Sequence, residues 1–154
     1  MSVEKAKEFL EKAGLGDRLT LHAEESDTVE HAAALIGCEP AHIAKTMAFL
    51  LDNTPIAVVC AGDAKVQNAK YKAYFAKKAK MVPFSEVEMI IGHEPGGVCP
   101  FGVNEGVKIY LDVSLKRFDT VYAAGGARNA TIGLSPAELE AALDAEWIDV
   151  CEIL

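Results

Sequence analysis

Apolar residues recur at helical spacing in the first part of the chain. Over residues 3–13 the apolar side chains fall on one face of a helix, and Gly14 ends the pattern. A second helical pattern begins after Asp27 or Thr28, either of which can serve as the N-cap, and it ends at Gly37. The pattern therefore predicts two amphipathic helices before residue 40.

The pattern then changes from helical spacing to continuous apolar runs. Pro40 opens a short helical turn, which delivers the chain to Lys45. Residues 46–51 and 56–60 are apolar runs of strand length, and the polar residues 52–55 separate them. This arrangement predicts a β-hairpin with a longer turn.

Short helices, strands and loops rich in Gly and Pro alternate in the rest of the chain. The predicted elements are a helix over residues 66–79, a helix from the capping box Ser85–Glu88 to Gly92, a loop over 93–106, strands over 107–112, 120–124 and 131–134, a helix from the capping box Ser135–Glu138 to Leu143, and a closing strand over 147–151. Irregular alternation with both hairpins and crossovers favours an α+β fold (mixed α/β) with a mixed, partly barrel-like β-sheet over a doubly wound fold.

Length and composition are those of an ordinary globular domain. The 154 residues are 51% hydrophobic and 25% charged, so we expect one domain over residues 1–154. No apolar run has the length of a signal peptide or a membrane span, and we expect a cytoplasmic protein without membrane contact. The four cysteines are widely scattered, which predicts free thiols.

The charge is unevenly distributed. A net charge of −8 argues against a general nucleic-acid binder. Six of the fifteen Lys and Arg residues nevertheless fall between residues 65 and 80, where no Asp or Glu occurs: Lys65, Lys70, Lys72, Lys77, Lys78 and Lys80. This basic segment is either a solvated helix face or a local surface for phosphates.

Lys45 is the first candidate for chemistry, because it stands between the helical turn and an apolar strand. Its stem could lie along the surface with the ammonium in water. Alternatively, the ammonium could lie at the rim of a pocket and hold an anionic or carbonyl group as a compact charge. The residues alone leave both interpretations open.

Two glycine-rich segments are further candidates. Gly96–Gly102 holds three glycines and Pro100, so its backbone could approach a ligand closely, or it could be only a tight connection. Gly125–Asn129 could form a backbone nest in which Arg128 binds a phosphate or a terminal ribose, or it could be an ordinary turn.

Other reactive side chains are weaker candidates. Cys99 has no base adjacent in the sequence, so we interpret it mainly as a small residue lining the loop. Asp63 could face a pocket, although capping of a following helix is favoured. The histidines show no metal-ligand spacing, and no metal site is predicted: His22, His31, His42 and His93.

Taken together, these features resemble the YbaK and prolyl-tRNA-synthetase-associated editing domains. The resemblance covers nearly the whole chain: Thr28–Glu30, Ala32–Ala33, Gly37, Ile43–Thr46, Gly96-x-x-x-Pro100, Ala124–Gly126 and Ser135–Pro136. It implies a barrel-like mixed sheet surrounded by helices, and a trans-acting deacylase that hydrolyses mischarged tRNA, with Cys- or Ala-tRNA(Pro) as expected substrates. Mischarged tRNA is the implied partner, prolyl-tRNA synthetase is a second candidate partner, and no cofactor is expected.

The resemblance also assigns roles to residues. Lys45 would anchor the substrate, while the backbone of the loop would position the aminoacyl ester. The catalytic group comprises Lys45, Gly96, Gly97, Val98, Cys99 and Pro100; the substrate-binding group comprises Thr46, Asp63, Gly125, Gly126 and Arg128; and the tRNA-binding group comprises Lys70, Lys77 and Lys78. Two alternatives remain: a relative that binds tRNA or a nucleotide without hydrolysis, and a thiol-dependent hydrolase that uses Cys99.

Overall fold

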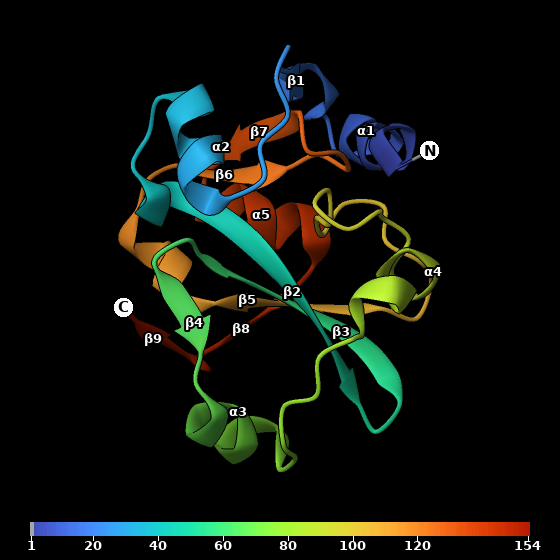
Figure 1. Ribbon diagram of the computed structural model, residues 1–154, viewed down its shortest axis with the longest axis vertical. Helices are drawn as coiled ribbons and strands as arrows, with labels where there is room; N and C mark the ends of the chain where they lie inside the picture. Colours follow the sequence, from blue (N-terminus) through green and yellow to red (C-terminus); the bar gives the residue numbers. More distant parts are fainter. Residues whose placement is uncertain (1) are drawn as a thin grey trace.

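The fold is organised around one mixed β-sheet, seen in the computed structural model of residues 2–154 (Figure 1). Neighbouring strands in the seven-stranded sheet follow the order β1-β7-β6-β2-β3-β5-β8, and β4 pairs with β9 in a separate two-stranded sheet. The strands are β1 (Thr20–Leu21), β2 (Ile43–Leu51), β3 (Thr54–Ala61), β4 (Ala64–Val66), β5 (Lys108–Asp112), β6 (Val121–Ala124), β7 (Ala130–Leu134), β8 (Glu146–Ile148) and β9 (Cys151–Ile153). The large sheet contains both parallel and antiparallel pairs, which confirms the predicted α+β fold with a mixed sheet.

Helices surround the sheet on several sides. In Figure 1, α1 and α2 lie at one end with β1, β6 and β7, whereas α3 lies at the opposite end. The α-helices are α1 (Ser2–Lys12), α2 (Val29–Ile36), α3 (Asn68–Phe75), α4 (Val87–Ile91) and α5 (Pro136–Leu143), and the short 3-10 helices are η1 (Gly16–Arg18), η2 (Pro40–His42), η3 (Phe84–Glu86) and η4 (Val113–Arg117). No helix among residues 2–154 has the length and apolar character needed to span a membrane.

The central hairpin turns more tightly than predicted. Asp52 and Asn53 form the turn with φ values of +50° and +65°, a left-handed conformation that Asp and Asn tolerate better than most residues. Pro55 already pairs with Leu50 inside β3. The longer turn predicted over residues 52–55 is therefore wrong.

Side-chain caps explain where two of the predicted helices begin. The Thr28 side chain accepts a hydrogen bond from the His31 amide at the start of α2. At α5, Ser135 and Glu138 form the predicted capping box, with both hydrogen bonds present. The capping box predicted at residues 85–88 is wrong, because Ser85 lies within η3 and α4 begins at Val87 without a side-chain cap.

The basic helix is shorter than predicted. Gln67 caps its N-terminus, and Ala76 ends it by adopting a left-handed conformation with φ of +61°. The helix therefore covers residues 68–75 rather than 66–79. The lysines at positions 77, 78 and 80 lie on the segment that follows it.

A buried carboxylate divides the predicted closing strand in two. Asp112 is 1% exposed and accepts hydrogen bonds from the amides of Ser114 and Val150, both at 2.9 Å. The chain turns at Val150, so that β8 joins the large sheet and β9 joins β4. A single strand over residues 147–151 is therefore a wrong prediction.

Two groups of buried side chains hold the layers together. The larger core includes Leu10 of α1, Leu111 of β5 and Leu139 of α5. A smaller cluster of Ala48, Val82, Val87 and Ile91 fixes α4 and the segment before it against β2. Burial of each large apolar side chain contributes about 1.5–3 kcal/mol, so the segment over residues 82–91 is firmly attached to the central strand.

Candidate functional site

Within the described part of the chain, the central strand β2 has no strand partner over three residues on one side. On that side β6 pairs with Ile43 and Ala44. Farther along, the Leu50 amide donates to the Lys80 carbonyl at 2.8 Å, and the Val82 amide donates to the Ala48 carbonyl at 3.0 Å. Between these pairings, no strand of the described chain borders residues 45–47 there.

The alternation of strand hydrogen bonds shows which backbone groups lie at this gap. Ala48 and Leu50 direct their backbone groups toward the segment over residues 80–82. Thr46 has the same parity in β2, so its amide and carbonyl point to the same side. The gap therefore offers one backbone donor and one backbone acceptor to a ligand.

A cavity of about 330 Å³ opens at the gap. This is the size of pocket that holds small molecules. Its walls come from six parts of the chain: residues 26–28 with α2, β2 over residues 43–48, residues 81–87, the loop at residues 95–98, β6 over residues 122–124, and residues 127–131. Its lining is mainly apolar, and the charged side chains in it are those of Asp27, Lys45 and Arg128.

Lys45 lines the cavity, and its side chain forms no hydrogen bond or ion pair with any residue in the described chain. The nearby carboxylate of Asp63 does not pair with it, because Arg117 binds both Asp63 oxygens at 2.5 and 3.0 Å. The hydrogen bond from Arg117 lowers the pKa of Asp63, and Lys45 contributes only a smaller electrostatic effect. The Lys45 ammonium is therefore available to an anionic or carbonyl group.

The structure places Asp63 outside the cavity lining. The favoured prediction that Asp63 caps a helix is wrong, because the residue stands between β3 and β4. Its ion pair with Arg117 joins this turn to the end of η4. Asp63 thus holds the local structure through Arg117 and forms no ion pair with Lys45 among the described residues.

Thr46 adds a polar atom to the cavity wall. Its Oγ1 atom is buried and has no hydrogen-bond partner among the residues that the structure describes. Leaving a buried hydroxyl unsatisfied costs about 1–3 kcal/mol. A ligand that supplied a hydrogen-bond donor or acceptor to Oγ1 would remove that cost. The unsatisfied hydroxyl of Thr46 is therefore consistent with a role in ligand binding.

The two predicted glycine-rich segments meet at the cavity. A Cβ atom on Gly97 would lie 2.6 Å from the Ala127 amide nitrogen and equally close to the Gly126 backbone. A Cβ atom on Gly96 would collide with Nε of Arg128, and Gly96 has φ of +90°. The close approach of these segments requires glycine at both positions.

The residues of the loop do not all face the cavity. Gly96 and Val98 line it, whereas Gly97, Cys99 and Pro100 are absent from its lining. In the second segment Arg128 lines the cavity, while the predicted residues Gly125 and Gly126 lie behind it. The structure thus brings both segments together and separates lining residues from supporting ones.

Arg128 connects the cavity to the segment before α2. Its guanidinium forms an ion pair with Asp27 at 3.1 Å. Its carbonyl oxygen accepts hydrogen bonds from the Ser26 amide and hydroxyl, both at 3.1 Å. The Arg128 side chain is 41% exposed, so it can reach a phosphate at the rim.

Cys99 is fully buried behind the loop, and burial raises the pKa of its thiol to about 12. A histidine does lie beside it, contrary to expectation, because Nε2 of His93 is 3.6 Å from the Cys99 sulfur. That nitrogen is also 2.6 Å from the Phe101 carbonyl oxygen, which can only accept a hydrogen bond. Nε2 therefore carries a proton and cannot deprotonate the thiol, and the geometry does not support a cysteine nucleophile.

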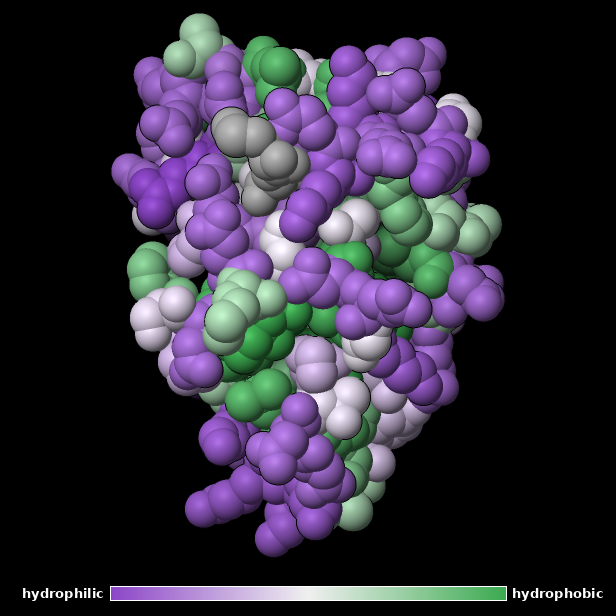
Figure 2. All heavy atoms as spheres, turned by 90° about the vertical axis from the view of Figure 1, so that its right-hand side faces the viewer, coloured by the Kyte–Doolittle hydropathy of each residue, from purple (hydrophilic) through white to green (hydrophobic). Residues whose placement is uncertain are grey.

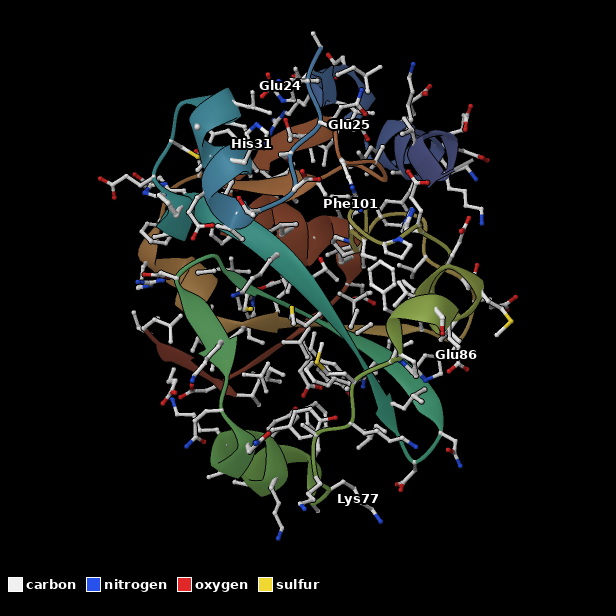
Figure 3. The ribbon with its side chains drawn as sticks, viewed as in Figure 1. Glu24, Glu25, His31, Lys77, Glu86 and Phe101 are labelled. Atoms are coloured by element: carbon white, nitrogen blue, oxygen red, sulfur yellow. The ribbon has the colours of Figure 1, made fainter. Side chains whose placement is uncertain are left out.

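The basic segment lies away from the cavity except at its C-terminal end, where Lys80 directly precedes the lining residue Met81. Lys70 binds Asp149 at 3.1 Å and the Cys151 carbonyl at 2.9 Å, and Lys77 pairs with Asp52 at 3.4 Å. Figure 3 shows Lys77 at one end of the molecule and His31 near the other. Lys78 is exposed on the segment that runs toward the rim at residue 81.

Several lining residues were not predicted from the sequence. The apolar face of α2 contributes Val29, Ala32 and Ile36, and the rim contributes Met81 and Phe84. Apolar residues at helical spacing are usually core residues, so no local signal distinguished them. Among the described residues, no cluster of three or more potential metal ligands occurs.

Comparisons with known proteins agree on one family. Residues 23–142 match the family model of the aminoacyl-tRNA editing domain. The uncharacterised protein YwhH of Bacillus subtilis is 49% identical over 129 residues, which cover 82% of each chain. The proline–tRNA ligase of Bacillus licheniformis is 31% identical over 120 residues, which cover 76% of this chain and 20% of the ligase.

A solved structure supports the same relationship. It was described as that of a proposed trans-editing enzyme for prolyl-tRNA synthetase. Its TM-score is 0.89, with 27% sequence identity, over 98% of this chain and 97% of that chain.

Proposed function

The chain belongs to the aminoacyl-tRNA editing domain family, and from that premise we propose that it is a trans-acting deacylase that hydrolyses the ester of mischarged tRNA. The family predicted from the sequence is thereby confirmed. The observation that carries the proposal is the unpaired Lys45 ammonium beside the partner-free stretch of β2, within an apolar cavity. Such a site can hold a small aminoacyl group and orient its carbonyl.

The cavity suits a small amino acid attached to a ribose. Lys45 would bind the carbonyl or the ribose end, and the apolar side chains of α2 and Val98 would surround the amino-acid side chain. We propose Cys- or Ala-tRNA(Pro) as the substrate, because two of the related proteins are a proline–tRNA ligase and a proposed trans-editing enzyme for prolyl-tRNA synthetase. Association with prolyl-tRNA synthetase itself is part of the same proposal.

The chemistry requires orientation more than a strong nucleophile. Water adds its oxygen to the ester carbonyl carbon, the bond to the ribose oxygen breaks, and the ribose oxygen leaves with a proton from that water. Lys45, the Thr46 hydroxyl and the backbone of residues 96–98 would position the carbonyl and stabilise the developing oxyanion. With a cysteinyl ester, the substrate thiol sulfur would instead bond to the carbonyl carbon, the bond to the ribose oxygen would break, the thiol proton would pass to that oxygen, and the amino acid would leave as a cyclic thioester.

Deacylation of a panel of charged tRNAs tests this function. Wild type is expected to release alanine or cysteine from tRNA(Pro) faster than proline. Lys45→Ala should lower the rate by about 100-fold or more, in the range found when one oxyanion-stabilising group is removed. Lys7→Ala is the matched control, because Lys7 is exposed on α1 and does not line the cavity.

Two results would contradict the proposal. If wild type released no amino acid from any charged tRNA, the chain would be a binding protein without hydrolytic activity. If Lys45→Ala and Lys7→Ala were equally active, the assigned anchor would be wrong. Measuring tRNA binding for the same variants separates these outcomes.

A further inference from the structure

An aromatic side chain at the rim of the cavity is left uncovered by the fold. Phe84 lines the cavity and is 72% exposed, and Met81 beside it is 56% exposed. Figure 2 shows apolar side chains gathered midway along the α4 side of the molecule, with hydrophilic side chains above and below. An exposed apolar surface at a cavity mouth commonly marks a binding surface.

The backbone that carries Phe84 is held rigidly. Val82 and Val87, on either side of it, are 5% and 9% exposed and pack in the smaller core. The Val82 amide is bonded to β2, and the Val87 amide donates to the Phe84 carbonyl. The ring is therefore presented from a fixed position, so little ordering is needed when a ligand binds.

We propose that Phe84 is the stacking platform for the terminal nucleobase of the bound tRNA, an inference that rests on the proposed function. The ester to be hydrolysed is attached to the terminal ribose, so the base on that ribose must lie within one nucleoside of the ester. With the amino acid directed toward α2, the nucleoside lies at the rim, where Met81 and Phe84 are exposed. Aromatic rings stack on every nucleobase because each base has a π-face.

The charge distribution favours a nucleic acid at this rim. Lys78 and Lys80 are exposed on the segment that leads into Met81, although the protein as a whole carries −8. The Lys80 carbonyl accepts a hydrogen bond from the Leu50 amide of β2, which places the C-terminal end of the basic segment beside the rim residue Met81. Phosphates that precede the terminal nucleoside would therefore lie near positive charge. If the rim bound an apolar segment of another protein instead, these lysines would add no binding energy.

A non-hydrolysable probe tests the stacking role directly. The probe is a short RNA ending in CCA, with alanine joined to the terminal ribose through an amide, and its Kd is measured by fluorescence. Phe84→Ala should weaken binding by about 5- to 150-fold, the effect expected from removing one stacked ring. Phe84→Trp should keep the affinity of wild type.

Met89→Ala provides the matched control. Met89 is also 72% exposed, yet it does not line the cavity. The Met89→Ala protein should therefore bind the probe with the affinity of wild type. Since Phe84 makes little buried contact, Phe84→Ala should also unfold at the urea concentration of wild type.

A second probe with an abasic terminal ribose makes the inference specific to the base. Wild type should bind it as weakly as Phe84→Ala binds the complete probe, and the two proteins should bind it equally. Equal affinity of wild type and Phe84→Ala for the complete probe would overturn the inference. It would also be overturned if Phe84→Ala bound both probes more weakly than wild type by the same factor. If wild type deacylates tRNA but the probes give either of these results, the stacking role is wrong and the proposed function stands. If the probes show base stacking but wild type does not deacylate tRNA, the proposed function is wrong and the stacking role stands.

Discussion

The Nε2 atom of His93 lies 2.6 Å from the carbonyl oxygen of Phe101. These two residues flank the loop over residues 94–100, part of which lines the site. Both side chains are fully buried, and Phe101 also packs on Phe9 of α1, with ring centroids 6.1 Å apart. The Nδ1 atom of His93 is buried, and no residue from 2 to 154 forms a hydrogen bond with it. One neutral imidazole therefore ties together the two ends of the loop over residues 94–100.

Acid should weaken this connection. Burial lowers the pKa of His93, and the positive charge of Lys5 adds to that effect. The adjacent Cys99 stays neutral, because burial raises its pKa to about 12. A group whose pKa is lower in the folded state favours unfolding when it is protonated, so its contribution to stability is complete above about pH 6.5 and falls as the pH decreases below that value.

Urea unfolding at several pH values checks this prediction. Wild type should lose stability between pH 7.5 and 5.5, and His93→Gln should lose less because its amide can donate to Phe101 without titrating. Identical pH dependence in His93→Gln and wild type would show that His93 does not titrate on unfolding.

Gly97→Ala should damage the site more than the fold. A Cβ atom there would be 2.6 Å from the backbone of the turn at Gly126, so the loop must move away from it. We expect a loss of about 1–3 kcal/mol in the free energy of unfolding together with a lower kcat for deacylation. Urea unfolding and single-turnover deacylation measure the two effects.

Gly37→Ala separates stability from activity. Gly37 has φ of +88° with open space around it, and it lies at the end of α2 outside the cavity lining. The Gly37→Ala protein should have a free energy of unfolding lower by about 1 kcal/mol, because alanine is strained at positive φ. Its kcat should equal that of wild type. Similar loss of kcat in both variants would mean that instability, rather than loop displacement, limits activity.

Cys99→Ala should remain an active enzyme. The thiol is buried, lies outside the cavity lining, and is beside an imidazole nitrogen that already carries a proton. We expect a kcat within about twofold of wild type and a stability loss of about 1 kcal/mol. Complete loss of deacylation in a folded Cys99→Ala protein would revive a thiol mechanism.

Charge reversal in the basic segment should weaken tRNA binding. Lys78→Glu should lower affinity and reduce the slope of log K against log salt, by about one unit for each phosphate that the protein no longer neutralises. Lys70→Glu should have a smaller effect, because the Lys70 ammonium is already bound to Asp149 and to the Cys151 carbonyl. Lys7→Glu on α1 is the control; if it matched Lys78→Glu, the effect would reflect net charge only.

Local sequence patterns predicted those helix ends that are determined by contacts between residues close in the sequence. Thr28 and Ser135 cap α2 and α5 as expected, because capping is a contact within one turn. The early end of α3 was not predictable in this way, since Ala76 is a good helix former that here adopts φ of +61°. Packing of Tyr71 and Phe75 against Phe49 and Tyr110 orients that helix instead.

The site was predictable in parts but not as an assembly. Lys45 and the glycines at 96 and 126 were candidates from the residues themselves, and the resemblance assigned their roles. Their meeting nevertheless depends on contacts about 30 to 80 residues apart in the sequence. Phe84 and His93 were missed because one resembles a core residue and the other has no partner at a recognisable spacing. Their exposure and burial are properties of the tertiary structure.

The interruption in strand pairing beside Thr46 also makes this residue a spectroscopic reporter. Its amide lies in the central strand of the sheet but faces the gap, so its hydrogen should exchange with solvent far faster than those of the paired amides in β2. A ligand that accepts this hydrogen would slow the exchange whether or not it is hydrolysed. Occupancy of the cavity can thus be followed at a single backbone position, independently of turnover.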